Sequence, residues 1–203
     1  MSMLRQAAAR SRPFAALPLL LVLAAPLAAQ SGAAAAPTPS APPSSPPPPT
    51  AQLEAMAKLS YMVGEWKGSG WIEVQGGQRL PFQGGERVQE KLGGLALLVE
   101  GRFLAKPPGA TEEIPVHTTL AVLSYDPREK RYEFDSWLAT GTSGEHVLTL
   151  TDDGWHWKIE YPGGAVRYTF RLGADGEWIE IGERSSDGER WRQFFEMRLR
   201  KEG

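Results

Sequence analysis

The sequence contains no cysteine, and this absence removes several possibilities at once. Without cysteine the chain forms no disulfide, carries no thiolate nucleophile and has no cysteine for a lipid anchor. Histidine is also scarce, with three residues among 203. His117, His146 and His156 lack the short spacings that metal ligands usually share, so we expect each at a surface or strand edge. The sequence therefore indicates no metal site.

Signatures of common catalytic sites are absent as well. No Gly-x-Ser-x-Gly elbow occurs, and the glycine pairs lie in turns rather than between a strand and a helix. The carboxylate pairs 112–113 and 152–153 lie in predicted loops. Glu177, Glu180 and Glu183 could face one another across strands, but acid–base chemistry needs a defined pocket that the sequence does not reveal. We assign no catalytic residue.

No apolar run is long enough for a comfortable membrane span. Residues 14–27 are apolar, follow three arginines and precede the small residues at 27–29. This pattern is typical of a secretory signal peptide, which we place at 1–29. We therefore expect a periplasmic or secreted protein with no membrane insertion after cleavage. The alternative is an uncleaved anchor.

Residues 30–50 have few side chains large enough to build a core. The segment is mostly Ala, Pro and Ser and ends in four prolines at 46–49. We expect a disordered or polyproline-like linker. The folded unit is then 51–203, a length typical of one domain.

The predicted domain has no excess of positive charge. The net charge of −2 becomes −5 when the three arginines before Thr50 are left out, because every acidic residue lies after it. A mildly acidic domain is a poor candidate for nucleic-acid or anionic-lipid binding. Composition does not indicate the oligomeric state.

One helix is expected, at 51–62, and no second one follows it. From residue 64 onward, alternating patterns separated by glycine-containing turns predict about eight to ten short strands. So many strands need a closed sheet to avoid open edges. We predict an all-β fold, an antiparallel up-and-down, calycin-like β-barrel preceded by a short helix. A β-sandwich is the alternative, although it would more often require longer connections.

The opening strand shows the pattern most clearly. Met62, Trp66, Ile72 and Val74 share one parity with glycines between them, whereas the other parity is mainly polar and includes Trp71. This alternation predicts one buried face. Glycines on that face allow sharp coiling or close approach of another backbone.

Four segments carry a family resemblance. They are LSYMVGEWKGSG (59–70), LPFQGGER (80–87), LGGL (92–95) and FEMRLRK (195–201), and the first contains the Gly-x-Trp spacing that opens lipocalin-like barrels. With them, the chain resembles calycin (lipocalin-like) barrels of the nitrobindin-related group of bacterial proteins. The resemblance implies that Trp66 fills the closed end beneath a cation from the last strand, for which Arg198, Arg200 and Lys201 are candidates.

The resemblance also bears on haem. In haem-binding members a histidine near the start of the last strand ligates the iron. The aligned position here is Phe194, or Phe195 if the register slips by one. We therefore expect no haem and no other cofactor.

The later strands predict an aromatic interior with a few polar tips. The candidate ligand-binding residues are Trp157, Tyr161, Tyr168, Phe170, Gln193 and Phe195. Such a lining suits a small hydrophobic molecule oriented by one or two hydrogen bonds and bound without catalysis. Two alternatives stay open: an enzyme acting on a similar molecule, such as an isomerase or hydrolase, and a filled barrel serving a structural or interaction role.

Overall fold

The computed structural model describes residues 49–203. The predicted signal peptide and nearly all of the predicted linker lie outside the described residues. Within residues 49–203, no helix combines the length and apolar character needed to cross a membrane.

Two short helices precede the sheet, where the sequence predicted one. Helix α1 spans Thr50–Ala57, and a 3-10 turn spans Ser60–Met62. The helix ends because the backbone N–H groups of Lys58 and Leu59 bond three residues back, to Ala55 and Met56. Met56 of α1, Met62 of the 3-10 turn and Leu59 between them are all buried. The two helices therefore contribute directly to the core.

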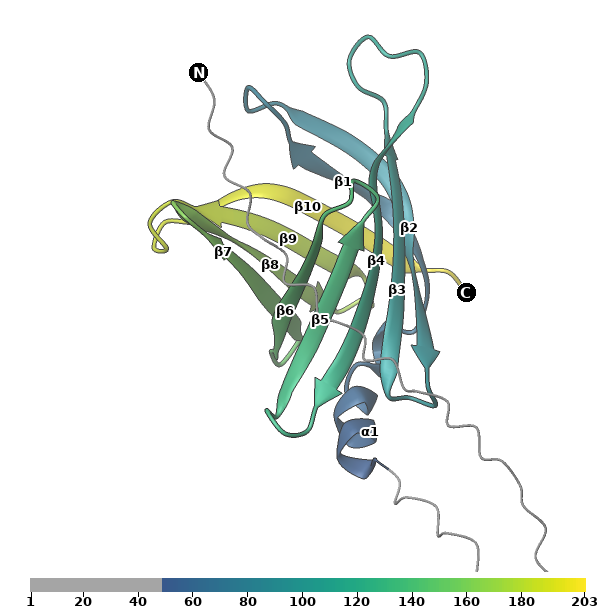
Figure 1. Ribbon diagram of the computed structural model, residues 1–203. Coiled ribbons are helices and arrows are strands. Elements are labelled where there is room, and N and C mark those ends of the chain that lie inside the picture. The colour runs from purple at the N-terminus through teal and green to yellow at the C-terminus, as the bar shows by residue number, and fades with distance from the viewer. Residues whose placement is uncertain (1–48) are drawn as a thin grey trace, which may run out of the picture. The chain divides into compact units, whose positions relative to one another are not determined.

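Ten strands follow the helices (Figure 1). They are β1 (Gly64–Glu73), β2 (Arg79–Lys91), β3 (Ala96–Ala105), β4 (Ile114–Asp126), β5 (Arg131–Leu138), β6 (Ser143–Leu150), β7 (Gly154–Tyr161), β8 (Gly164–Leu172), β9 (Trp178–Ser185) and β10 (Arg192–Lys201). Each strand pairs with the next in sequence, and β1 pairs antiparallel with β10, so the sheet closes. The predicted up-and-down barrel is confirmed and the sandwich alternative is wrong. Closure gives every strand a partner on both sides, and the pairing is shortest between β6 and β7, where only Thr149–His156 and Leu150–Trp155 are paired.

Glycines on the inner face of β1 allow β10 to lie close. A Cβ atom at Gly68 would lie 2.0 Å from the carbonyl oxygen of Arg198, and one at Gly70 would lie 2.1 Å from that of Glu196. Real side chains do not tolerate such contacts. The glycine pattern of the opening strand therefore reflects this close backbone approach.

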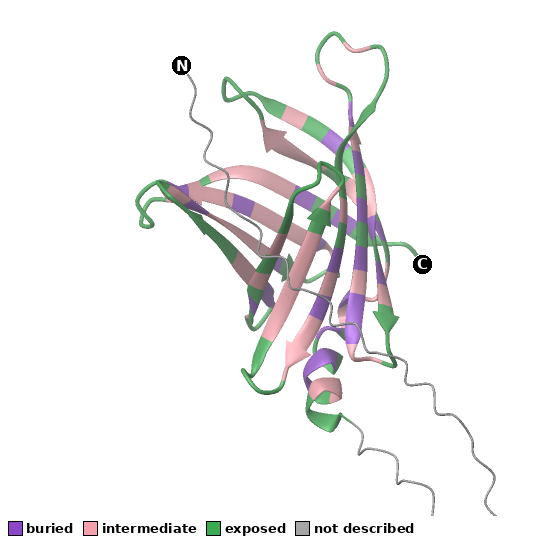
Figure 2. Cartoon of the chain, viewed as in Figure 1, coloured by how far each residue is buried: buried purple, intermediate pink, exposed green. Residues whose placement is uncertain are grey.

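Trp66 packs where the barrel is closed by the helices. It is 2% exposed, and its indole Nε1 donates a hydrogen bond to the backbone oxygen of Met62 at 2.8 Å. Its ring meets that of Trp178 edge to face at 5.4 Å. Tyr132 donates a hydrogen bond to the Ala55 carbonyl at 2.9 Å and so links β5 to α1. Figure 2 shows buried positions in α1 and along the adjoining strands.

The cation over Trp66 is Lys201. In the β1–β10 register these two residues are partners, and the lysine Nζ lies 5.2 Å from the ring centroid. This placement corrects the expectation for Arg198 and Arg200. Arg198 and Arg200 lie on the outer face because they alternate with the inward residues Met197 and Leu199. There Arg198 forms an ion pair with Glu177 at 3.0 Å, and Arg200 forms one with Asp175 at 2.8 Å.

Candidate functional site

A cavity of about 350 Å³ lies inside the barrel. It extends from mid-barrel toward the end opposite α1, where Thr142 of the β5–β6 turn and Ser143 at the start of β6 line it (Figure 1). Its aromatic wall is formed by Phe82, Phe103, Phe134, Trp157, Tyr168 and Phe195. Its polar groups are Glu86, His117, Thr119, Ser136, His146 and Glu180. The site is thus mainly apolar with a few polar side chains.

Cross-strand pairing builds the aromatic wall. Trp157 of β7 pairs in register with Tyr168 of β8, and their rings stack with centroids 4.7 Å apart. The ring centroids of His146 and Phe134, which are partners across β5 and β6, lie 4.5 and 5.1 Å from that of Trp157. Opposed inner-face residues of an antiparallel sheet meet in this way. The result is a continuous aromatic surface across β5–β8.

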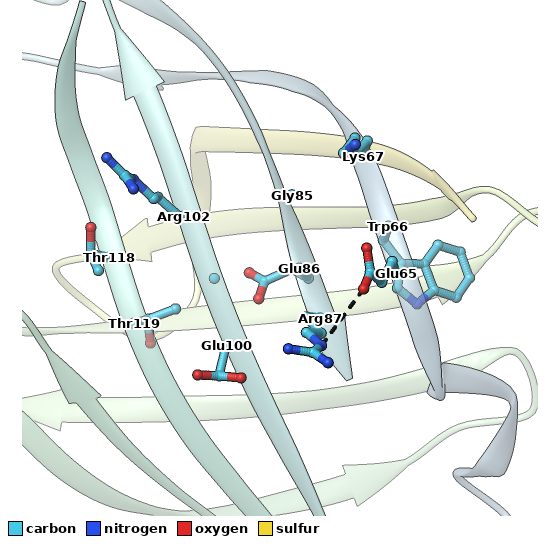
Figure 3. A pocket seen from close by; sticks show the side chains of 11 residues that line it. Glu65, Trp66, Lys67, Gly85, Glu86, Arg87, Glu100, Arg102, Thr118 and Thr119 are labelled. Atoms are coloured by element: carbon cyan, nitrogen blue, oxygen red, sulfur yellow. Dashed lines mark ion pairs between the residues drawn. The ribbon is translucent and has the colours of Figure 1, made fainter. Parts of the chain in front are cut away.

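Glu86 is a buried carboxylate on the inner face of β2. It is 8% exposed, and both its oxygens lie against Gly101, where an added Cβ would be 2.6 Å from each. Its Oε2 has no hydrogen-bond partner within residues 49–203. The nearest cation along the strand, Arg87, faces outward and pairs with Glu65 at 3.6 Å (Figure 3). The carboxyl group of Glu86 is therefore removed from water, and no donor in the described residues replaces the lost hydrogen bond at Oε2.

Burial raises the pKa of Glu86 well above its usual range, and the charge of Glu180 raises it further. Burying a charged carboxylate away from water costs free energy, so the side chain favours its neutral form. Both glutamates line the same cavity.

Glu180 lies on the inner face of β9. In register it stands between Phe170 of β8 and Met197 of β10. The indole Nε1 of Trp178 donates a hydrogen bond to its Oε2 at 3.3 Å, which favours the charged form. Desolvation is stronger and raises the pKa of Glu180 to about 7. This side chain is therefore poised to change charge near neutral pH.

The cavity wall carries no positive side chain. Neither lysine nor arginine lines it, and burial lowers the pKa of both His117 and His146, which keeps the imidazoles neutral at pH 7. Desolvation raises the pKa of Tyr168, and the charge of Glu180 raises it further. No group of three or more potential ligands within residues 49–203 is placed to hold a metal ion.

An indole donor in the same wall lacks a partner. The Nε1 atom of Trp157 is buried without a hydrogen bond in the described part of the chain. Because the ring lines the cavity, a ligand acceptor could satisfy it. The wall thus offers one unpaired donor, at Trp157, and one unpaired acceptor, at Glu86.

The predicted ligand-binding residues separate into two groups. Trp157, Tyr168 and Phe195 line the cavity. Phe170 instead is fully buried in the closed end, stacked on Trp155 at 5.0 Å. Tyr161 is the last residue of β7, is 48% exposed and does not line the cavity.

Gln193 points outward because β10 is irregular. The register shifts between Gln193 and Phe195, so Phe194 is an extra residue that reverses the alternation. Gln193 pairs in register with Glu183, which forms an outer-face ion pair with Arg167 at 2.7 Å. The expectation that Gln193 lines the interior is therefore corrected.

The sequence reasoning missed four cavity residues. His117 and His146 were expected at a surface or edge, and Glu86 was not considered; Glu180 was considered only as one of three glutamates across strands. Those three in fact lie on or beside one strand, β9, with Glu180 alone lining the cavity. Parity was the available signal, because Glu86 has the same parity as the buried residues Phe82 and Val88 of β2, and Glu180 has the same parity as the buried Trp178 of β9.

Fold and site together define a ten-stranded antiparallel barrel with one end covered by a helix and an aromatic cavity inside. The structure is similar to the crystal structure of Rv2717c from M. tuberculosis, with a TM-score of 0.54 and 17% identity over 73% of this chain and 98% of that one. A likeness at this identity establishes the fold alone. Comparisons with protein-family models and with curated proteins find no match.

Proposed function

We propose that this barrel binds a small, mainly apolar molecule in its interior. The observation that carries the proposal is the cavity of about 350 Å³ with an aromatic wall and unpaired polar atoms. Ligand pockets usually measure about 300–1,000 Å³, so this one suits a molecule of one or two rings. The cavity favours binding over the filled-barrel alternative.

The energetics are sufficient for such a role. Burial of apolar surface contributes about 25 cal/mol per Å². A ligand that buries about 300 Å² would gain about 7 kcal/mol before the cost of association, to which paired polar groups add. After the cost of association, an affinity of about 10–100 µM is expected.

The family and location belong to the same proposal. We infer a calycin-type barrel of the nitrobindin-related group from the four sequence segments, with the fold likeness in support. We also propose that it acts outside the cytoplasm, on the basis of the signal-like N-terminus. Phe195, one of the two residues aligned with the haem-ligating histidine, packs 5.7 Å from Phe82 in the cavity wall, so we propose no haem ligation from β10.

An enzyme acting on a similar ligand is the second candidate. Glu180, with a pKa of about 7, and Tyr168 line one cavity, and a carboxyl group titrating near the working pH suits proton transfer. No hydrogen bond joins Glu180 to Tyr168 or to a histidine within residues 49–203, so no catalytic triad is assembled there. Binding without turnover is the simpler function for this arrangement.

Filling the cavity provides the test. Ser136 lines it and pairs in register with Ala121 and Gly144, which leave space beside it. In Ser136→Phe, saturable binding of 1-naphthalenemethanol, followed by quenching of tryptophan emission, should weaken at least about tenfold. Ser69→Phe on the exposed outer face is the matched control and should bind normally. Lack of saturable binding by the wild-type protein at about 100 µM would overturn the proposal.

A further inference from the structure

The charges of the cavity restrict the chemistry of its ligand. Two carboxyl groups, those of Glu86 and Glu180, face an interior with no lysine or arginine in its wall. Three other strands contribute the remaining titratable groups, His117 from β4, His146 from β6 and Tyr168 from β8, and all three are neutral at pH 7. Strand β10 contributes only apolar side chains to the cavity. Nothing in the cavity wall balances a negative charge.

We propose that the ligand is a hydrophobic organic cation, an aromatic or aliphatic body with a protonated amine that is held between Glu86 and Glu180. The inference rests on the proposed binding function and names the class of molecule bound. The main support for this proposal is Glu86, because its carboxyl group is 8% exposed, lies in the cavity wall and has an oxygen with no partner in the described chain. An ammonium N–H is the donor that this oxygen lacks.

The aromatic wall supports the same ligand. A cation within about 6 Å of a ring face is attracted by the ring quadrupole, and the attraction strengthens where water is excluded. Trp157, Tyr168 and Phe195 surround the same space as the two carboxyl groups. Aromatic faces together with carboxylates form a common recognition surface for amines.

Anionic ligands fit this cavity poorly. The carboxylate of a fatty acid would meet two glutamates and no cation, so like charges would be buried together. A neutral alcohol can enter, since the protonated glutamates can donate to it, but it gains no charge-assisted bond. We therefore expect affinity to fall in the order amine, alcohol, carboxylate.

Proton release should accompany binding. In the free protein burial raises the pKa of Glu86 well above its ordinary value and that of Glu180 to about 7, whereas a bound ammonium ion favours the charged form of both carboxyl groups. Affinity for the amine should therefore increase as pH rises from 6 to 8. Loss of protons from the free amine would limit the increase at higher pH.

Three probes of the same shape provide the test: 1-naphthylmethylamine, 1-naphthalenemethanol and 1-naphthoate. Isothermal titration calorimetry of the wild-type protein at pH 8 should give an amine affinity at least about tenfold above that of the alcohol, and no saturable binding of the carboxylate. Repeating the amine titration at pH 7 in phosphate and in Tris should reveal proton release, because these buffers differ in ionisation enthalpy.

Variants then assign the effect to the two glutamates. In Glu86→Gln and Glu180→Gln the preference for amine over alcohol should shrink about tenfold or more, while alcohol binding persists. Glu100→Gln, on the exposed outer face of β3, is the matched control and should keep the preference. A cooperative urea unfolding transition, followed by tryptophan emission, shows that each variant is folded.

The outcomes are distinguishable. Equal wild-type affinities for amine and alcohol, or amine binding without proton release, would overturn the cation inference and leave the binding function intact. Tighter binding of 1-naphthoate than of 1-naphthylmethylamine would also overturn the cation inference. Absence of binding by all three probes would remove the proposed function itself.

Discussion

Replacing Glu180 should change how the stability of the barrel depends on pH. The folded pKa is about 7, against an ordinary value of 4.5. As pH rises, the unfolded chain releases this proton near 4.5, while the folded protein keeps it until about 7. The folded state therefore binds more protons in this window, and the free energy of unfolding falls as pH rises through it.

The size of the effect follows from the shift. About 2.5 pKa units at 1.36 kcal/mol each correspond to about 3 kcal/mol lost between pH 4.5 and 7, with no further loss above that. This is an upper value, since Glu180 is partly exposed to the cavity. Glu180→Gln removes the titrating group, so its stability relative to wild type should increase by up to about 3 kcal/mol from pH 4 to pH 8.

Urea unfolding followed by tryptophan emission at pH 4, 5, 6, 7 and 8 measures this difference. Glu100→Gln, on the outer face of β3, is the control, and its stability curve should run parallel to that of the wild type. Other groups that titrate in this range are common to both proteins and cancel in the difference, apart from Glu86, whose pKa the charge of Glu180 raises. A constant difference between Glu180→Gln and wild type would show that Glu180 is not desolvated, and the reasoning about the cavity charges would fail with it.

Three further predictions concern the closed end, haem and export. Trp66→Ala should lower the free energy of unfolding in urea by about 3–5 kcal/mol. Trp71→Ala should lower it much less, because Trp71 lies on the outer face, where the Arg79 guanidinium is 3.6 Å from its ring centroid. Equal losses would mean that the faces of β1 are misassigned. Titration with ferric haem should give only a weak, non-specific spectral change, and a sharp one-to-one Soret band would contradict this. N-terminal sequencing of protein from its own host should begin near Gln30, and an intact Met1 on protein in the cytoplasm would refute export.

Much of the fold was predictable because the signals are local. Period-two alternation places Trp66 inward and Trp71 outward without reference to the rest of the chain. Short glycine-containing turns allow only neighbouring strands to pair, which leads to an up-and-down order. With that many strands, closure follows from the need to avoid open edges.

The cavity was predictable only in part. Trp157, Tyr168 and Phe195 were predicted correctly as facing inward because β7 and β8 alternate regularly and Phe195 lies after the irregularity in β10. Gln193 was misplaced because one extra residue, Phe194, reverses the pattern, and a bulge depends on the partner strand rather than on local sequence. Phe170 faces inward as predicted, but it lies near the closed end of the barrel, where it is part of the packed core and does not line the cavity.

The sequence by itself determined the strand pattern and the inner face of each regular strand, including the inward position of Trp66, since these depend on spacing along the chain. Only the tertiary structure decided which distant residues meet. Closure brings β1 beside β10, which places Lys201 rather than Arg200 over Trp66. The same closure brings Glu86 of β2 and Glu180 of β9 to one interior. Their raised pKa values arise from burial and mutual proximity, which no local pattern records.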